Sequence, residues 1–332
     1  MAQNRGMDIA DRLKLDAPVV QAGMGGGIAG APLAAAVSAA GGLGTLGLLP
    51  PRKLRAAIAT VRDHAPGRAV AVNLLMPFTR RPHIEVCLEA KIDIAVMAFA
   101  IDRALIERLT DRGVFVMVMV GTERQATEAL AYGANGLIAQ GREAGGHLVG
   151  TVAQADFVPK ALALAGSRPV FAAGGIATAD DTRAALAAGA TGVVAGTRFL
   201  LTNESGAHPV YRQRIIDTDR TLETTVFGLA WPERHRVIPN AATDRWCHPD
   251  GTARRLPAAI NKFSAPLSRV PDRGDGALLR LQRPALPFLT PITLTADMPA
   301  AWVDCAALYA GETALRLDRI TSAAQAVADL AP

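Results

Sequence analysis

The sequence predicts a (β/α)8 barrel of the TIM type that carries an inserted subdomain after its eighth strand. Within the first 200 residues, short apolar runs rich in β-branched side chains alternate eight times with segments of helical periodicity. Continuous apolar strands are typical of a parallel sheet covered on both faces, and eight strand and helix units close such a sheet into a barrel. After Thr202 the alternation stops, which predicts a change of architecture there.

The expected strands begin about 20 to 35 residues apart. They comprise residues 17–23, 42–48, 69–75, 92–99, 114–120, 135–140, 169–175 and 191–196. The helices between them are expected at residues 32–41, 52–65, 84–90, 103–113, 123–133, 156–166 and 180–189. Several of these helical segments end in glycine, as a helix C-cap commonly does, so the pattern also predicts where the helices end.

A doubly wound open sheet is the alternative fold. The run GGGIAG at residues 25–30 follows an expected strand and matches the G-x-G-x-x-G pattern of dinucleotide-binding sheets. In that pattern an acidic residue about 20 positions further on holds the ribose. No Asp or Glu occurs between Asp16 and Asp63, so the barrel is favoured.

The chain divides into a barrel core (1–202), an insertion that covers one mouth of the barrel (203–299) and a C-terminal helix (300–332). Eleven of the 21 prolines fall in the insertion. Residues 301–330 regain helical periodicity and are expected to complete the outer ring of helices. For Trp231, His235 and Trp246 of the insertion, packing of its interior is the favoured expectation, and lining of the substrate pocket is the alternative.

Composition argues against two classes of partner. The net charge is +5, but the basic residues are scattered and aromatic residues make up only 5%, so neither a basic stripe nor a stacking platform for nucleic acid is present. Nine glycines and several prolines interrupt the uncharged stretch from Ala17 to Pro51, which is therefore not expected to span a membrane. The N-terminus lacks the apolar core of a signal peptide, and the three cysteines are widely spaced, so we expect a cytoplasmic protein.

Two glycine-containing strand ends predict a phosphate site. AAGG at residues 172–175 and GTRF at residues 196–199 end the seventh and eighth expected strands. Loops after these strands commonly hold phosphate in barrels, because backbone N–H groups there can turn toward an anion. The alternative is that Gly174 and Gly175 only form a tight turn before the next helix. The two loops together favour phosphate binding.

A histidine follows the sixth expected strand in the run QGREAGGHLVG. His147 lies where a barrel places catalytic groups, and an imidazole there can serve as donor, acceptor or general base. The alternative is a structural histidine bonded within a loop. Arg142 and Glu143 are expected to be structural, and His64 and His83 receive no role. No His, Cys or acidic residues at the strand ends have the spacing of metal ligands, so no metal site is predicted.

Five motifs, taken in order, resemble those of the nitronate monooxygenases, formerly called 2-nitropropane dioxygenases. They are PVVQAGMGGGIAGAPLAAAVSAAGGLGTLG, AVNLL, QGREAGGH, PVFAAGGIATADDTRAALAAGATGVVAGTRFL and LYAG. The resemblance is dense over residues 15–205 and looser in the C-terminal segment. It implies an FMN-dependent barrel, and flavin-dependent enoyl-acyl-carrier-protein reductases and some NADH:quinone reductases are relatives of this family.

The resemblance also implies roles for individual residues. Gly23, Met24 and Gly25 would lie along the flavin ring, Asn73 and Gln140 would hydrogen-bond to the cofactor, and Gly145 would face it. The FMN phosphate would be held by Ala173, Gly174, Gly175, Gly196 and Thr197. His147 matches the active-site histidine beside the flavin.

The chain departs from the family pattern at two strand ends. Met119 stands at the end of the fifth expected strand, where relatives often have Lys or Gln. The run MAFAID at residues 97–102 stands where the family commonly shows glycine followed by proline. Both changes predict a more apolar site than a small nitronate requires. Gln140 stands where many of the acyl-carrier-protein reductases have an acid, and this favours the monooxygenase branch.

The leading hypothesis is that the protein oxidises an alkyl nitronate with FMN and O₂ to a carbonyl compound and nitrite, without nucleic-acid or membrane partners. One alternative is an NAD(P)H-dependent reductase of a quinone or an enoyl thioester on the same FMN scaffold. A second is a flavin-free isomerase or lyase that acts on a phosphate-bearing substrate, and a noncatalytic binding protein is the least favoured. The sequence leaves the oligomeric state open, with a homodimer as one option.

Overall fold

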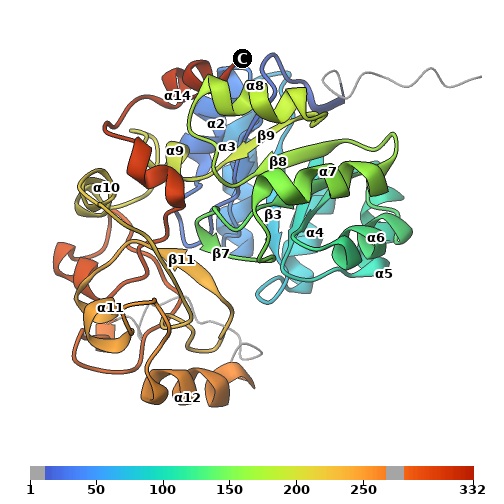
Figure 1. The fold of residues 1–332 in the computed structure, drawn as a ribbon. Helices are drawn as coiled ribbons and strands as arrows, with labels where there is room; N and C mark the ends of the chain where they lie inside the picture. The colour runs from blue at the N-terminus through green and yellow to red at the C-terminus, as the bar shows by residue number, and fades with distance from the viewer. Residues whose placement is uncertain (1–11, 267–279) are drawn as a thin grey trace, which may run out of the picture.

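The protein is described by a computed structural model that covers residues 12–266 and 280–332. Its main sheet has eight strands in the order β1-β9-β8-β6-β5-β4-β3-β2, and every pairing between them is parallel. A bridge between Val20 and Leu43 joins β1 to the start of β2 and closes the ring. The predicted (β/α)8 barrel is therefore confirmed (Figure 1).

The eight strands lie within or next to the predicted apolar runs. They are β1 (Val19–Gln21), β2 (Thr45–Leu46), β3 (Ala71–Leu75), β4 (Ile94–Ala98), β5 (Phe115–Val120), β6 (Gly136–Gln140), β8 (Val170–Ala173) and β9 (Gly192–Ala195). Some predicted runs, such as 17–23 and 169–175, are longer than their strands because they include residues of the loops at the carboxyl ends. Those loops bear the residues with candidate functions.

Seven helices connect these strands and cover the outside of the barrel. They are α2 (Ala31–Ala39), α3 (Pro51–His64), α4 (Arg81–Glu89), α5 (Arg103–Thr110), α6 (Glu123–Ala131), α7 (Gln154–Ala165) and α8 (Ala179–Ala187). The side chains of Asp102, Thr122 and Thr178 cap α5, α6 and α8 by accepting a backbone N–H three residues further on. Such caps satisfy donors that the first helical turn leaves unpaired, so they define where these helices begin.

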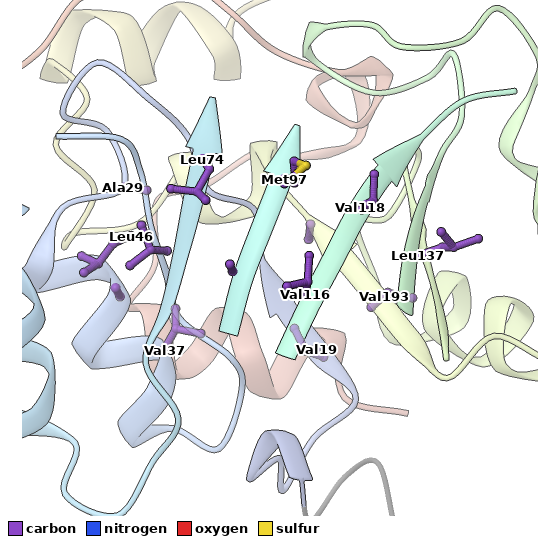
Figure 2. Packing of buried hydrophobic residues seen from close by; sticks show 14 of the residues in the cluster. Val19, Ala29, Val37, Leu46, Leu74, Met97, Val116, Val118, Leu137 and Val193 are labelled. Atoms are coloured by element: carbon purple, nitrogen blue, oxygen red, sulfur yellow. The ribbon is translucent and has the colours of Figure 1, made fainter. Parts of the chain in front are cut away.

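Side chains on each strand alternate between two separate apolar cores. On β5, Val116, Val118 and Val120 belong to the core between sheet and helices, whereas Met117 and Met119 belong to the interior of the barrel. Figure 2 shows members of the outer core on β3, β4 and β5. Each buried Val or Leu contributes roughly 1.5–3 kcal/mol to folding. The same alternation directs polar residues of the strands inward.

The insertion forms a second unit beside the barrel's carboxyl end. After the short helix α9 (Thr197–Leu200) it contains α10 (Pro209–Ile216), β10 (Leu222–Thr224), β11 (His235–Val237), α11 (Ala241–Trp246) and α12 (Arg255–Ser264). Its sheet has the order β10-β11-β7, and β7 (Gly146–His147) comes from the loop after β6. The antiparallel pair of β7 and β11 joins the insertion to the barrel next to His147 (Figure 1).

The prediction of a helix over residues 301–330 is wrong for most of that range. Two short 3-10 helices, η2 (Ala300–Asp304) and η3 (Glu312–Arg316), precede α14 (Ala323–Leu330). Apolar residues between 303 and 317 form one buried cluster with residues of α10 and with Ile238, which directly follows β11. Only α14 returns to the barrel, where it packs against both α2 and α8 and completes the helical ring.

Among the residues that the structure describes, none of the helices is long and apolar enough to cross a membrane.

Candidate active site

The barrel interior receives three of the predicted residues at its carboxyl end. Asn73 on β3, Met119 on β5 and Gln140 on β6 occupy inward-facing positions, between outward-facing neighbours of the outer core. The side-chain amide of Asn73 donates a hydrogen bond of 2.6 Å to the carbonyl of Gly23. A Cβ atom on Gly23 would lie 2.2 Å from the Cβ of Asn73, so only glycine allows this approach of the first loop to β3.

The loop after β8 requires glycine for steric reasons. Gly174 and Gly175 have φ angles of +93° and +76°, a region that side chains with a Cβ disfavour. A Cβ on Gly174 would also lie 3.0 Å from the carbonyl oxygen of Gly141. The turn therefore exposes backbone groups instead of side chains at the end of the strand.

The loops after β8 and β9 provide free hydrogen-bond donors. The two strands are neighbours in the sheet, so their carboxyl ends lie side by side. Within the described part of the chain, the backbone N–H groups of Gly175 and Gly196 donate to no other residue. The hydroxyl of Thr197 accepts a hydrogen bond of 2.9 Å from the N–H of Gly311, which leaves its own proton available. These donors can bind a phosphate group.

One arginine supports the phosphate loop from outside, and another does not contribute. Arg316 donates to the carbonyl of Gly175 and forms an ion pair of 3.0 Å with Asp181. Burial raises the pKa of Asp181, but Arg316 and two backbone N–H groups outweigh that effect and lower it. Arg198 of the GTRF motif instead donates to the carbonyls of Leu201 and Arg319 at 2.9 Å each. A phosphate at these loops would therefore be held by backbone donors and the Thr197 hydroxyl, without Arg198.

His147 lies on β7, where Gln140 holds its backbone. The amide nitrogen of Gln140 donates to the carbonyl of His147 at 3.3 Å, and the amide oxygen accepts the N–H of Val149 at 2.9 Å. The same amide nitrogen lies 3.6 Å from the sulfur of Met119. Gln140 thus connects the end of β6 to the segment that carries the histidine.

Aromatic rings surround the imidazole of His147. The indole of Trp231 is stacked on it, with ring centroids 3.6 Å apart and planes inclined by 14°. The rings of His235, Tyr309 and Phe99 lie 5.1, 5.4 and 5.9 Å from it. For Trp231 the pocket-lining alternative is therefore favoured over packing alone, because its ring contacts the candidate catalytic histidine.

The other two residues that the sequence assigned to packing have structural contacts. His235 is fully buried; its Nδ1 is 2.9 Å from the carbonyl of Glu233 and its Nε2 accepts the N–H of Phe227 at 3.4 Å. Burial lowers its pKa to about 4. The indole N–H of Trp246 donates to the carbonyl of Pro284 at 2.9 Å. Both residues stabilise the insertion, as the sequence predicts.

His147 is neutral at physiological pH and has an unused nitrogen. Burial, with a smaller contribution from His235, lowers its pKa well below the ordinary value. Its Nε2 atom is buried and has no hydrogen-bond partner. A buried polar atom without a partner is uncommon, and at a strand end of a barrel it indicates a group that binds a ligand or transfers a proton.

Two residues next to His147 are structural. The carboxylate of Glu143 accepts the N–H of Gln154 at the start of α7, at 3.0 and 3.2 Å, which agrees with the predicted structural role. A Cβ on Gly145 would lie 2.3 Å from the backbone nitrogen of Gly311. Close packing against the LYAG segment therefore accounts for this glycine. Among the described residues, no group of His, Cys, Asp or Glu could hold a metal ion.

The structure brings most of the predicted residues to one end of the barrel, and it adds two aromatic side chains, Phe78 and Phe99, to which the sequence assigned no role. Phe78, Phe99 and Trp231 form an aromatic cluster in which Trp231 contacts both phenylalanines at ring distances of 5.1 and 4.9 Å. Phe99 was detectable as the last residue of a predicted strand, and it directly follows the observed β4. No local pattern decided between packing and pocket lining for Trp231, because it reaches the site through contacts distant in sequence.

Comparison with known proteins identifies one family. The model of the nitronate monooxygenase family matches residues 8–81 and 49–332. A (3aS,4S,5R,7aS)-5-hydroxy-7a-methyl-1-oxo-octahydro-1H-indene-4-carboxyl-CoA dehydrogenase of Mycobacterium tuberculosis is 36% identical over 238 residues, which are 69% of this chain and 65% of the relative. The nitronate monooxygenase of Pseudomonas aeruginosa is 32% identical over 255 residues, which are 61% of this chain and 71% of the relative. The chain thus matches slightly less than two thirds of the dehydrogenase.

Two solved structures share the fold over nearly the whole chain. A nitroalkane oxidase from Streptomyces ansochromogenes has a TM-score of 0.76 and 26% identity, over 97% of this chain and 96% of that one. FabK from Thermotoga maritima has a TM-score of 0.75 and 27% identity, over 98% of this chain and 94% of that one. These similarities extend through the insertion.

Proposed function

The chain belongs to the nitronate monooxygenase family, and from this premise we propose that it is an FMN-dependent oxidoreductase that converts an alkyl nitronate and O₂ to a carbonyl compound and nitrite. The observation that carries the proposal is the buried, unpartnered Nε2 of neutral His147 at the carboxyl end of the barrel. The predicted resemblance to this family is confirmed. The substrate and the reaction are our proposal.

The residues present fit an FMN cofactor. Gly174, Gly175 and Gly196, with the hydroxyl of Thr197, would hold its phosphate through N–H and O–H donors that the described protein leaves free. The backbone of Gly23, Met24 and Gly25 would adjoin its ring, and Ala173 and Asn73 would border it from the barrel interior. When bound, FMN supplies the acceptor for two electrons and the position at which O₂ reacts.

His147 would act on the substrate as a neutral imidazole. Its low pKa keeps it unprotonated, so one ring nitrogen can accept a proton and the other can donate a hydrogen bond. With a neutral nitroalkane, the imidazole would take the proton from the carbon next to the nitro group. With a nitronate, which has already lost that proton, the imidazole would donate to a nitro oxygen. Gln140 would keep the ring in place through the backbone of β7.

A reductase of an enoyl thioester on the same scaffold is the second candidate. The rings against His147 are aromatic or neutral, so the site suits a neutral carbonyl group as well as a nitro group. The similarity to FabK and to a dehydrogenase that acts on a CoA thioester supports this candidate.

An absorbance spectrum of the purified protein followed by two assays separates the candidates. We expect the flavin absorption bands, rapid O₂ consumption with nitroethane nitronate and slow bleaching by NADH or NADPH without oxygen. Rapid bleaching with no nitronate turnover would favour the thioester reductase. A colourless protein that does not take up FMN would contradict both candidates.

A further inference from the structure

Phe99 adopts a backbone conformation that favours glycine. It follows β4 directly and has a φ angle of +72°, one of four positive values among the described non-glycine residues. A large side chain in this region is disfavoured because its Cβ crowds the backbone. Residues in such conformations are concentrated at functional sites, where the surroundings hold them in place.

The ring of Phe99 contacts both members of the stacked pair over the site. It lies edge-on to Trp231, with centroids 4.9 Å apart and planes at 80°, and edge-on to His147 at 5.9 Å and 75°. Edge-to-face contacts at these distances are favourable, so Phe99 helps to hold the indole against the imidazole. A glycine at this position would remove both contacts.

The neighbours of His147 differ in how firmly they are held. The hydroxyl of Tyr309 donates to the carbonyl of Pro291 at 3.0 Å, and both nitrogens of His235 have partners. Phe99 has no polar group, and no hydrogen bond holds the indole N–H of Trp231 within the described chain. Trp231 follows Ala230, which also has a positive φ angle of +65°. Phe99 and Trp231 are therefore the covering side chains that a substrate can displace.

We propose that Phe99 and Trp231 determine substrate size by closing the approach to Nε2 of His147. Because this atom is buried, a substrate reaches it only where these two rings give way or leave a narrow opening. A compact substituent on the reacting carbon fits beside them, whereas a long or branched one must displace them. The substrate class is then a short-chain nitro compound, and in this respect the inference rests on the proposed function.

The apolar departure at residues 97–102 places a phenylalanine ring beside His147. The sequence comparison predicted an apolar site and, from that, a substrate other than a small nitronate. In the structure the side chain of Phe99 is half-buried, and its ring lies 5.9 Å from the imidazole of His147. Phe99 therefore reduces the space next to the histidine, and the departure favours small substrates.

The variant Phe99→Gly tests the proposal because glycine readily adopts the positive φ angle that residue 99 has in the structure. The matched control is Lys91→Gly, since Lys91 is exposed and also has a positive φ angle, of +50°. The measurement is kcat/KM for a series from nitroethane to nitrohexane, supplied as nitronates. We expect Phe99→Gly to raise the ratio of kcat/KM for nitrohexane to that for nitroethane by about 10-fold or more, and Lys91→Gly to leave it unchanged. Trp231→Phe, which keeps a smaller ring, should raise it less.

A second measurement reports on access to His147 without depending on activity. Diethyl pyrocarbonate acylates accessible neutral imidazoles, and peptide mass spectrometry locates the modified histidines. In the purified holoprotein, we expect His147 to be protected while exposed His64 is modified. Phe99→Gly should remove that protection and leave the rate of acylation at His64 unchanged. In Lys91→Gly, His147 should stay protected.

The outcomes of the two measurements are distinguishable. If no nitro compound is turned over but Phe99→Gly unmasks His147, the proposed reaction is wrong and the closing role of Phe99 stands. If Phe99→Gly changes neither the chain-length preference nor the modification of His147, the inference is overturned while the reaction stands. A wild-type enzyme that already prefers nitrohexane would also overturn it.

Discussion

The indole of Trp231 lies parallel to the imidazole of His147, with the ring centroids 3.6 Å apart. The two residues are 84 positions apart in the sequence and come from different units, since His147 belongs to the loop after β6 and Trp231 to the insertion. The antiparallel pairing of β7 with β11 brings these units together. The insertion therefore covers one face of the imidazole and contributes to its burial.

Removing this indole is expected to change the pH dependence of the reaction. Burial is the main cause of the low pKa of His147, so Trp231→Ala should admit water and raise that pKa toward 6.5. A protonated imidazole accepts no proton, so activity should be lost at a higher pH than in the wild type. The measurement is the profile of kcat/KM against pH with neutral nitroethane.

Trp246→Ala provides the control for this prediction, because Trp246 bonds to Pro284 and has no contact with His147. Its profile should match the wild type. If kcat/KM of Trp231→Ala falls at the same acidic pH as that of the wild type, the stacking does not determine the protonation of His147.

Gln140→Leu should separate a role in positioning from a role in cofactor binding. The variant leaves the carbonyl of His147 and the N–H of Val149 without their partner, which should cost about 1–3 kcal/mol of unfolding free energy. Turnover should fall while FMN affinity stays close to that of the wild type. Thermal unfolding, steady-state kinetics and fluorescence titration with FMN measure these three quantities. A large loss of FMN affinity would instead support the cofactor contact that the family resemblance implies.

Gly175→Ala tests the phosphate loop, and the chain offers a close control. Gly175 and Gly113 have the same φ angle of +76°, and an added Cβ would meet only one atom within 4 Å at Gly175 and none at Gly113. Both variants should therefore lose about 1–2 kcal/mol of stability from backbone strain. Only Gly175→Ala should weaken FMN binding, since it disturbs the N–H donors at the end of β8. Equal FMN dissociation constants for the two variants would remove Gly175 from the phosphate site.

The barrel and its phosphate loops were predictable because their signals are local. Apolar runs, helix caps and glycines at strand ends follow from neighbouring residues, and the eight strands lie within or close to the predicted runs. His147 was predictable for the same reason, as the histidine that follows a strand. The inward directions of Asn73 and Gln140 follow from the two-residue alternation of their strands.

The remaining features depend on contacts between distant segments. Trp231 reaches His147 only because β11 pairs with β7, and the sequence around residue 231 has no regular period that reveals this. The segment 301–322 has a helical pattern, but packing against the insertion outweighs that preference. The conformation of Phe99 is likewise set by the rings around it, since its own type disfavours a positive φ angle.

The central claim is that His147 acts on the substrate beside FMN. The most direct test is the turnover of His147→Ala with nitroethane at equal bound FMN, with His64→Ala as the control for an exposed histidine. We predict that His147→Ala binds FMN like the wild type. Its rate of O₂ consumption should be lower by about 100-fold or more, as expected for the loss of a general base. Undiminished O₂ consumption by the FMN-loaded variant would contradict the account.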